Sequence, residues 1–254
     1  METLFIPSKN RVKNCKFIQY CYENKIPAIV VLEPEDQMQY REAYPNMQYM
    51  ILPESNQGIS FVRNFIKRYA EQAGLSHYWM SDDDVTNIYR REGTKMIKIG
   101  FKDLQEIEDK FKGIDNASLC SLEYQQFAWS ATKPLIKDSF CDVFVFVNVK
   151  NAQGVYYRPY AEGKEDRDFA MQLIKKGTNT YRSTEFGFAA PKNGSNAGGL
   201  KETFYDLEGR ESVCCDRMIE LWGENVCYKI VKPDGRIDLK INWKEINSLQ
   251  SSLF

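Results

Sequence analysis

The first hundred residues alternate short apolar runs with segments whose apolar positions recur at helical spacing. Residues 28–32 (AIVVL) are a β-branched run of the kind found in parallel strands buried on both faces. Residues 58–74 show the clearest helical spacing, and Gly74 is a typical helix-ending residue. The expected strands are 3–7, 28–32, 49–52 and 77–80, and the expected helices are 13–24, 34–44 and 58–74. Strands separated by helices predict a mostly parallel sheet with right-handed crossovers.

The second half of the chain is less regular. Its expected helices are 101–111, 164–176 and 214–222, and its expected strands are 118–123, 143–149 and 180–190. Residues 226–242 are typical of a hairpin, and residues 192–199 (KNGSNAGG) of a loop. No repeat and no linker rich in Pro or Ser interrupts the pattern, so we expect one α/β domain over residues 1–254.

Composition excludes several classes of protein. The 254 residues include 34 Lys and Arg, 35 Asp and Glu, and a single His, with 43% apolar and 27% charged residues. This balance excludes a disordered chain and a charged tail but not a basic face offset by an acidic site. Seven cysteines without a CxxC pair argue against a disulfide framework or a cysteine zinc site. Without a secretory signal or a long apolar run, we expect no membrane contact and a cytoplasmic location, in the host cytoplasm if the protein is viral.

The acidic run Asp82, Asp83 and Asp84 directly follows the fourth expected strand. Ligands of parallel sheets bind beyond the carboxyl ends of the strands, where this run would lie. Repulsion among crowded carboxylates is costly unless a cation or fixed hydrogen-bond donors balance it, and hard oxygen ligands suit Mg²⁺ or Mn²⁺ bridging to phosphates. A solvated acidic turn is the plainer alternative. The position after an apolar strand favours a metal that holds a nucleoside diphosphate.

A second acidic group opens the expected helix 164–176. Glu165, Asp166 and Asp168 all lie near its start, where a carboxylate can cap the helix or serve as a general base. The spacing alone does not choose among the three.

Cationic and polar residues elsewhere in the first half of the chain could meet the nucleotide. Ser8 and Arg11 follow the first expected strand, and Arg63 lies early in the helix 58–74, where its guanidinium could offset diphosphate charge. The single histidine, His77, is expected to be a packed, hydrogen-bonded residue. Its isolation removes support for a Ser-His-Asp triad or a two-histidine zinc site. Neither GxxxxGK[ST] nor GxGxxG occurs.

Basic residues suggest an acceptor surface, although ordinary surface charge is the alternative. Residues 86–102 hold Arg90, Arg91 and Lys95 interleaved with aromatic rings, a mixture suited to phosphates and bases. The expected C-terminal hairpin adds further lysines. Lys192 lies at the start of the loop that contains Gly198 and Gly199, and this loop could close over a substrate.

Three motifs in order resemble a known family. They are residues 5–11 (FIPSKNR), residues 58–64 (GISFVRN) and residues 79–85 (WMSDDDV), with later support from residues 165–169 (EDRDF) and 196–199 (NAGG). The series resembles GT-A-fold nucleotide-sugar glycosyltransferases. It is most similar to the phage group associated with thymine and methylcytosine dioxygenases of the TET/JBP type, related to the base-J glucosyltransferase.

The resemblance implies a GT-A, Rossmann-like fold, with a mostly parallel central sheet flanked by helices and a mixed acceptor-side second half. Residues 1–100 would form the nucleotide-sugar half and residues 101–254 the acceptor half. It implies a UDP-sugar donor and Mn²⁺ or Mg²⁺ on Asp82 and Asp84, with Ser8, Arg11, Arg63 and Asp83 near the nucleotide-sugar.

The same resemblance makes Asp166, with Glu165, the candidate base. Arg90, Arg91, Lys95, Lys192, Gly198 and Gly199 would meet the acceptor. That acceptor is expected to be a hydroxymethylated pyrimidine in DNA, and no obligate protein partner is evident. Many GT-A enzymes complete their metal site with a late histidine, which this chain lacks after His77.

Two other functions stay open at this point. One is a GT-A glycosyltransferase that acts on a protein or glycan hydroxyl. The other is a non-catalytic nucleic-acid-binding module, against which the three consecutive aspartates argue, because uncompensated carboxylates repel phosphate.

Overall fold

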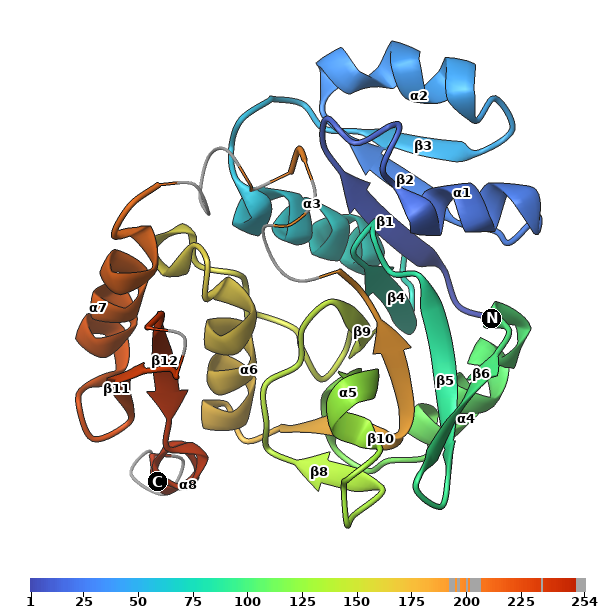
Figure 1. Ribbon diagram of the computed structural model, residues 1–254. Coiled ribbons are helices and arrows are strands. Elements are labelled where there is room, and N and C mark those ends of the chain that lie inside the picture. The colour runs from blue at the N-terminus through green and yellow to red at the C-terminus, as the bar shows by residue number, and fades with distance from the viewer. Residues whose placement is uncertain (192–194, 196, 200, 202–206, 234, 250–254) are drawn as a thin grey trace.

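The computed structural model is a mixed α/β fold, in which helices cover both faces of a ten-stranded sheet (Figure 1). It describes residues 1–191, 195, 197–199, 201, 207–233 and 235–249. The sheet order is β3-β2-β1-β4-β9-β7-β10-β5-β6, and β8 pairs with β10. Within the described residues, no helix has the length and apolar character needed to cross a membrane.

The first four strands form the parallel part of the sheet. Register pairs such as Phe5 with Ile29 join β1 to β2, and β1 also runs parallel to β4. The strands of this part are β1 (Leu4–Ser8), β2 (Ile29–Leu32), β3 (Gln48–Ile51) and β4 (His77–Ser81). The helices between them are α1 (Lys16–Glu23), α2 (Gln37–Ala43) and α3 (Ile59–Gln72). This part confirms the parallel α/β arrangement expected from the sequence.

The rest of the sheet is mixed. Strand β9 runs antiparallel to both β4 and β7, whereas β10 runs parallel to β7 and antiparallel to β5. The strands are β5 (Asn87–Glu92), β6 (Lys95–Ile99), β7 (Ala117–Tyr124), β8 (Leu135–Lys137), β9 (Phe144–Asn148) and β10 (Asn179–Ala189). The helices are α4 (Leu104–Lys112), α5 (Gln125–Ala128) and α6 (Glu165–Lys175). The sequence pattern missed the β5–β6 hairpin, β8 and α5.

The C-terminal part packs on the outer side of α6. It consists of α7 (Arg210–Trp222), the hairpin β11 (Cys227–Val231) and β12 (Ile237–Ile241), and α8 (Trp243–Ser248). Met171 and Ile174 of α6 belong to its apolar cluster, whereas Phe169 and Leu173 of the same helix face the sheet. Helix α6 is therefore apolar on two sides and joins this part to the sheet.

The core lies on the two faces of the sheet. One cluster contains residues of α1, α2 and α4, and the other contains residues of α3 and α6. Trp79 and Tyr78, neighbours in β4, are both fully buried in opposite clusters, because successive side chains of a strand point to opposite faces. All seven cysteines are buried, free thiols.

Candidate active site

A cavity of about 370 Å³ opens where β1 and β4 end and where α3 and α6 begin. It is the place at which an open parallel sheet binds ligands. Residues from segments far apart in the chain line it. Those singled out from the sequence are Ser8, Arg11, Arg63, Asp82, Asp83, Asp84, Glu165, Asp166 and Gly199. The two acidic groups, some eighty residues apart, therefore face one space.

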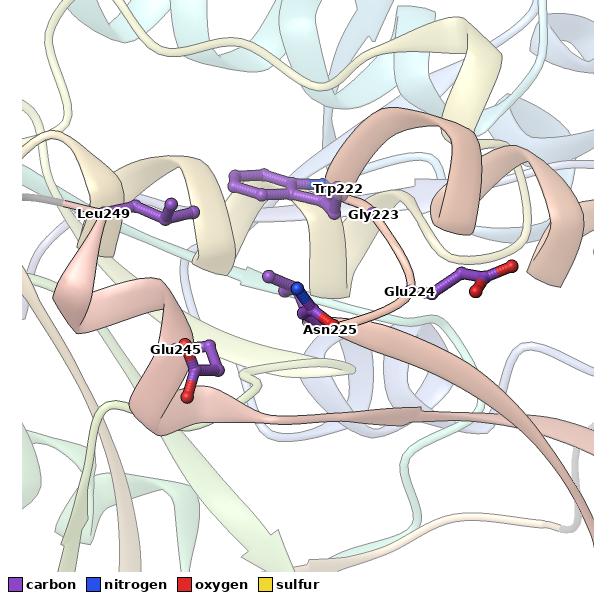
Figure 2. Close-up of a pocket in the computed structure, with 7 residues that line it drawn as sticks. Trp222, Gly223, Glu224, Asn225, Glu245 and Leu249 are labelled. Carbon is purple, nitrogen blue, oxygen red and sulfur yellow. The ribbon is translucent and has the colours of Figure 1, made fainter. Parts of the chain in front are cut away.

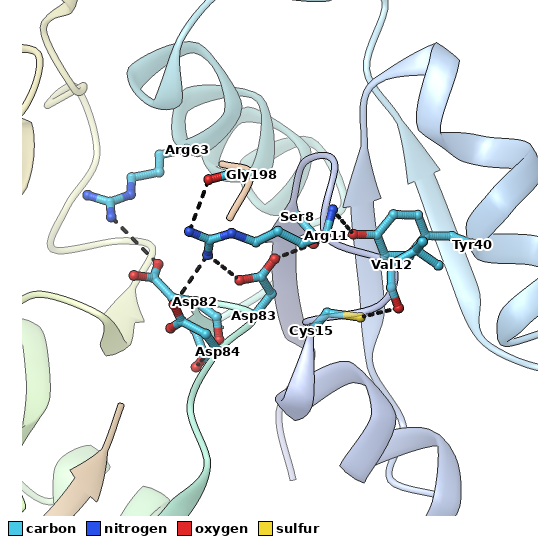
Figure 3. Close-up of polar contacts among 11 residues, drawn as sticks. Ser8, Arg11, Val12, Cys15, Tyr40, Arg63, Asp82, Asp83, Asp84 and Gly198 are labelled. Carbon is cyan, nitrogen blue, oxygen red and sulfur yellow. Dashed lines mark hydrogen bonds and ion pairs between the residues drawn. The ribbon is translucent and has the colours of Figure 1, made fainter. Parts of the chain in front are cut away.

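Asp83 is held by the turn that follows β1 (Figure 3). The Ser8 hydroxyl donates to one carboxylate oxygen of Asp83, and Arg11 Nη1 donates to the other at 2.8 Å. Tyr40 completes the arrangement, because its hydroxyl lies 2.6 Å from Ser8 Oγ and accepts the backbone N–H of Arg11 at 3.2 Å. Burial raises the pKa of Asp83, and the Arg11 charge opposes that effect. Asp83 is only 2% exposed, so it positions Arg11 rather than reaching a ligand.

Asp82 and Asp84 flank this buried carboxylate. The Asp82 side chain remains 38% exposed to the cavity, and Arg63 Nη2 lies 3.9 Å from its Oδ1. Desolvation of its carboxylate in the cavity wall raises the pKa of Asp82 to about 7; the Arg63 charge opposes this effect, and the Asp84 and Asp83 charges add to it. Asp84 pairs with Arg11 Nη1 at 3.2 Å. Additional positive charge in the cavity would favour the ionised form of Asp82.

The structure separates the three carboxylates at the start of α6. Glu165 pairs with Arg63 at 3.1 Å and is 5% exposed. Asp168 is fully buried and accepts from Arg158, Gln172 and the Trp222 indole, the last at 2.8 Å. Asp166 lines the cavity and accepts the backbone N–H of the next residue at 2.7 Å. Of the three, Asp166 is the one that reaches the cavity and makes no ion pair within the part of the chain that the structure describes.

Asp142 is a cavity residue that the sequence analysis did not single out. Burial and the neighbouring Asp166 charge raise its pKa well above the ordinary range, against the opposing charges of Arg167 and Arg182. The next residue, Val143, has φ +49°, an unusual value for a β-branched side chain. Its carbonyl accepts the N–H of Asp82 at 3.0 Å, so this turn is tied to the acidic run. The cavity thus has a carboxylate from a third segment.

The other predicted acceptor residues lie in different places. Arg90, Arg91 and Lys95 belong to the β5–β6 hairpin, where Arg90 pairs with Glu106 of α4. Phe101, one of the aromatic rings within residues 86–102, is buried, at 3% exposure. Lys192 lies outside the described residues.

Gly198 and Gly199 contact the turn after β1. Gly199 donates its N–H to the Lys9 carbonyl at 3.0 Å, and Arg11 Nη2 lies 3.4 Å from the Gly198 carbonyl (Figure 3). A Cβ on Gly199 would lie 2.8 Å from the Arg11 guanidinium, so only glycine allows this approach. These two glycines therefore lie beside Arg11.

The single histidine lies away from the cavity, at the other end of β4 from the acidic run. Its ring stacks on Phe146 with a centroid distance of 5.0 Å, and its Nε2 lies 3.0 Å from Asn148 Nδ2. Burial lowers the pKa of His77. It is the packed, hydrogen-bonded residue that the sequence indicated.

Asp82 and Asp84 are the residues that fit a divalent ion. Among the residues described, no group of three or more His, Cys, Asp or Glu side chains is arranged to hold a metal by itself. Mg²⁺ commonly takes one or two protein carboxylates and completes its shell with water and substrate phosphate. Two hard carboxylates on a cavity that also holds Arg11 and Arg63 match that pattern.

A second hollow, of about 470 Å³, lies in the C-terminal part (Figure 2). Among the residues that the structure describes, its lining includes Trp222 and Leu249, together with Glu224 and Glu245, but no Lys or Arg. An anionic nucleotide would meet no cationic lining there. The cavity at the carboxyl ends of β1 and β4 is therefore the candidate active site.

The family model of the TET-associated glycosyltransferases matches residues 3–199 of the 254. The chain belongs to this family. The match includes the turn after β1, the acidic run, the start of α6 and both glycines beside Arg11. It confirms the resemblance seen in the sequence, and with it the GT-A-type α/β fold. The activity class of the family is glycosyl transfer.

Several solved structures share parts of this arrangement at low identity. A197 from STIV is 16% identical, with 95% of each chain covered and a TM-score of 0.46. HddC from Yersinia pseudotuberculosis, complexed with GMP-PN, is 10% identical over 75% of this chain and 93% of its own, with a TM-score of 0.43. A 4-diphosphocytidyl-2C-methyl-D-erythritol synthase is 12% identical over 70% and 85%, with a TM-score of 0.42. No curated protein matches the chain.

Proposed function

We propose that this family member transfers a sugar from a UDP-sugar to the hydroxymethyl group of 5-hydroxymethylcytosine or 5-hydroxymethyluracil in DNA. One observation carries the proposal. A single cavity brings the carboxylates after β4 together with the carboxylate of Asp166 at the start of α6. A transferase needs such a pair of sites, one for the leaving diphosphate and one for the proton of the attacking hydroxyl. Residues 1–100 then supply most of the donor side and residues 101–254 most of the acceptor side.

The donor side would be formed by the turn after β1, the start of α3 and the acidic run. Asp82 and Asp84 would hold Mn²⁺ or Mg²⁺, which would neutralise charge that develops on the leaving diphosphate. Arg11 and Arg63 offer guanidinium groups that match phosphate oxygens. Ser8 and Asp83 set the position of Arg11 through the contacts described above.

Asp166 is the proposed general base of the acceptor side. In the reaction, the acceptor oxygen forms a bond to the anomeric carbon while the bond from that carbon to the diphosphate oxygen breaks. The hydroxyl proton passes to the Asp166 carboxylate, and UDP leaves with the bonding electrons. Glu165 is instead engaged by Arg63, and would hold that guanidinium in place.

The DNA acceptor is supported by the family and by the chemistry of the substrate. A group associated with methylcytosine and thymine dioxygenases is expected to act on the hydroxymethyl pyrimidines that such oxidation produces. The hydroxyl of these bases projects into the major groove, so the enzyme would reach it there or from an extruded nucleotide.

The test is transfer of labelled sugar from a panel of UDP-sugars to DNA that contains 5-hydroxymethylcytosine or 5-hydroxymethyluracil, with Mn²⁺ or Mg²⁺ present. We expect transfer to one of these DNAs, none to unmodified DNA, and loss of transfer in Asp84→Ala and Asp166→Asn. Asp115→Asn, at an exposed position distant in sequence from the site, is the matched control and should retain activity.

Two outcomes would contradict the proposal. Transfer to a peptide or oligosaccharide hydroxyl, with none to modified DNA, would assign a different acceptor to the same fold. Salt-sensitive DNA binding without UDP release, and without a thermal shift on addition of UDP and Mn²⁺, would indicate a non-catalytic binding module.

A further inference from the structure

Two large aromatic side chains in the short segment that follows β7 are exposed to solvent. Phe127 on α5 is 59% exposed, and Trp129, directly after α5, is 52% exposed. Both rings are carried by a short helical segment with its own hydrogen bonds. Trp129 Nε1 donates to the Gln126 carbonyl at 2.9 Å, and Ser130 Oγ donates to the Phe127 carbonyl at 3.3 Å. Exposed aromatic rings held in this way are typical of binding surfaces.

This aromatic pair is connected to the cavity through Tyr124. Tyr124 is the last residue of β7 and lines the cavity. Its ring meets the Phe127 ring edge-on, with a centroid distance of 6.2 Å. A ligand that extends out of the cavity past Tyr124 would therefore meet Phe127 next.

The β5–β6 hairpin adds positive charge on the same face of the sheet as α5. A Cβ built on Gly187 of β10 would lie 3.0 Å from Met96 Cε and 3.5 Å from Ala128 Cβ, so β6 and α5 both approach this glycine. Met96 pairs with Arg91 across the hairpin, and paired residues share a face. Arg91 Nη1 also donates to the Ala131 carbonyl, just after Trp129.

Strand alternation divides the basic residues of this hairpin between its two faces. Arg91 lies on the α5 face, and so does the register pair Tyr89 and Lys98. Arg90 lies on the opposite face, where it pairs with Glu106 of α4. Lys98 is exposed, as is Lys133 shortly after Trp129. Only some of the basic residues of the β5–β6 hairpin therefore lie on the same face of the sheet as α5.

We propose that the Phe127 and Trp129 rings each stack on a nucleobase of a single-stranded or locally opened DNA segment and in this sense form a stacking platform, with Arg91, Lys98 and Lys133 meeting the phosphates of that segment. This inference rests on the proposed function, because it supplies the acceptor strand with a path to the cavity. Aromatic faces that stack on bases, beside cations that meet the backbone, are the usual elements of single-strand binding surfaces. The added positive charge favours a polyanion over a neutral glycan, which would need only the rings.

The test measures binding of a fluorescently labelled single-stranded oligonucleotide to the full chain, without donor. Phe127→Ala and Trp129→Ala should each weaken binding roughly tenfold, and the double variant further, because each stacked base contributes on that scale. Ile97→Ala is the matched control. Ile97 is 41% exposed and lies on the face of the β5–β6 hairpin opposite to Arg91, so its replacement should leave the affinity for the oligonucleotide unchanged. Both aromatic side chains are exposed, so we expect these variants to fold, which circular dichroism and the melting temperature would check.

Transfer assays separate this inference from the proposed function. If the inference and the proposed function are both correct, Phe127→Ala and Trp129→Ala raise the KM for hydroxymethylated DNA about tenfold and leave hydrolysis of the UDP-sugar donor unchanged. Equal affinity of wild type and both variants for the oligonucleotide would overturn the platform even if transfer to DNA occurs. Oligonucleotide binding that depends on both rings, without any transfer, would support the platform and refute the proposed activity. The platform would also be overturned if the rings instead mediate dimerisation. In that case the molecular mass would depend on protein concentration, and both substitutions would abolish this dependence without any effect on DNA binding.

Discussion

Arg63 Nη1 donates to Glu165 Oε1 at 3.1 Å, joining the second turn of α3 to the first turn of α6 across 102 positions of sequence. The other terminal nitrogen of the same guanidinium lies 3.9 Å from Asp82. Arg63 is only 9% exposed, and its face lies over the Tyr157 ring at 5.5 Å. One fixed cation therefore lies between the carboxylates of the proposed donor side and those of the proposed acceptor side.

Removal of this cation should destabilise the fold. Arg63→Met would leave Glu165 buried without its partner, and breaking a buried ion pair costs about 3 kcal/mol or more. Urea unfolding of the variant at neutral pH would measure that loss. The double variant Arg63→Met with Glu165→Gln should recover a large part of it, because no uncompensated charge remains. If the losses in free energy of unfolding of the two single variants simply add in the double variant, Arg63 and Glu165 are not energetically coupled.

The carboxylates at the start of α6 should respond to substitution in opposite ways. Asp166→Asn should reduce sugar transfer by roughly 10²–10⁴-fold, the usual contribution of a general base, with little change in melting temperature. Asp168→Asn should instead lower stability, because it weakens the buried ion pair with Arg158. The turnover number and the melting temperature of both variants, measured side by side, check this division. Full activity of Asp166→Asn would remove it as the base.

Asp142 should make stability depend on pH. Burial and the Asp166 charge raise the pKa of Asp142 to about 7, above its value in the unfolded chain. An acid with a raised folded pKa binds more protons when folded, so folding becomes less favourable as pH rises from about 4 to about 7. Asp142→Asn removes this effect. Relative to wild type, the free energy of unfolding of the variant should increase by about 3 kcal/mol between pH 5 and pH 8.

Unfolding by urea at several pH values would measure that gain. Asp115→Asn, which replaces an aspartate at an exposed position, is the control. An Asp142→Asn curve parallel to that of wild type would show that Asp142 is ionised at low pH in the folded protein.

The parallel part of the fold follows from local sequence patterns, and the rest does not. Residues 28–32 are apolar and β-branched because β2 is buried on both faces, so the strand is visible in the sequence. The β5–β6 hairpin is mostly half-buried or exposed, and its residues are polar enough to resemble a charged loop. The antiparallel insertion of β9 between β4 and β7 depends on pairing distant in sequence, which no local pattern shows.

The same distinction applies to the candidate site. The acidic run was expected in the cavity because it directly follows a strand that the pattern predicts. Asp142 was missed because it reaches the cavity only through the antiparallel direction of β9, which brings the start of that strand beside the end of β4. Ser81 of β4 pairs with Phe144 of β9, two residues after Asp142. Phe127 and Trp129 were missed because α5 is a single short turn without a helical repeat.

Gly199 should be required for the position of Arg11, and therefore for donor binding. A Cβ at this residue would lie 2.8 Å from the guanidinium of Arg11, and Gly199 also has φ +61°. Gly199→Ala should therefore displace Arg11 from its contacts with Asp83 and Asp84 and weaken UDP binding by roughly tenfold, the loss of about one charge-assisted hydrogen bond. Titration of UDP with Mn²⁺, followed by the thermal shift, measures this effect.

Gly209 provides a matched control for backbone strain. It has φ +73°, but a Cβ there would meet nothing within 4 Å. Gly209→Ala should cost about 1 kcal/mol of stability through its left-handed backbone and leave UDP binding intact. If both alanine variants bind UDP as the wild type does, close packing of Gly199 on Arg11 has no role in donor binding. If only Gly199→Ala loses affinity, the steric contact rather than backbone strain accounts for the loss.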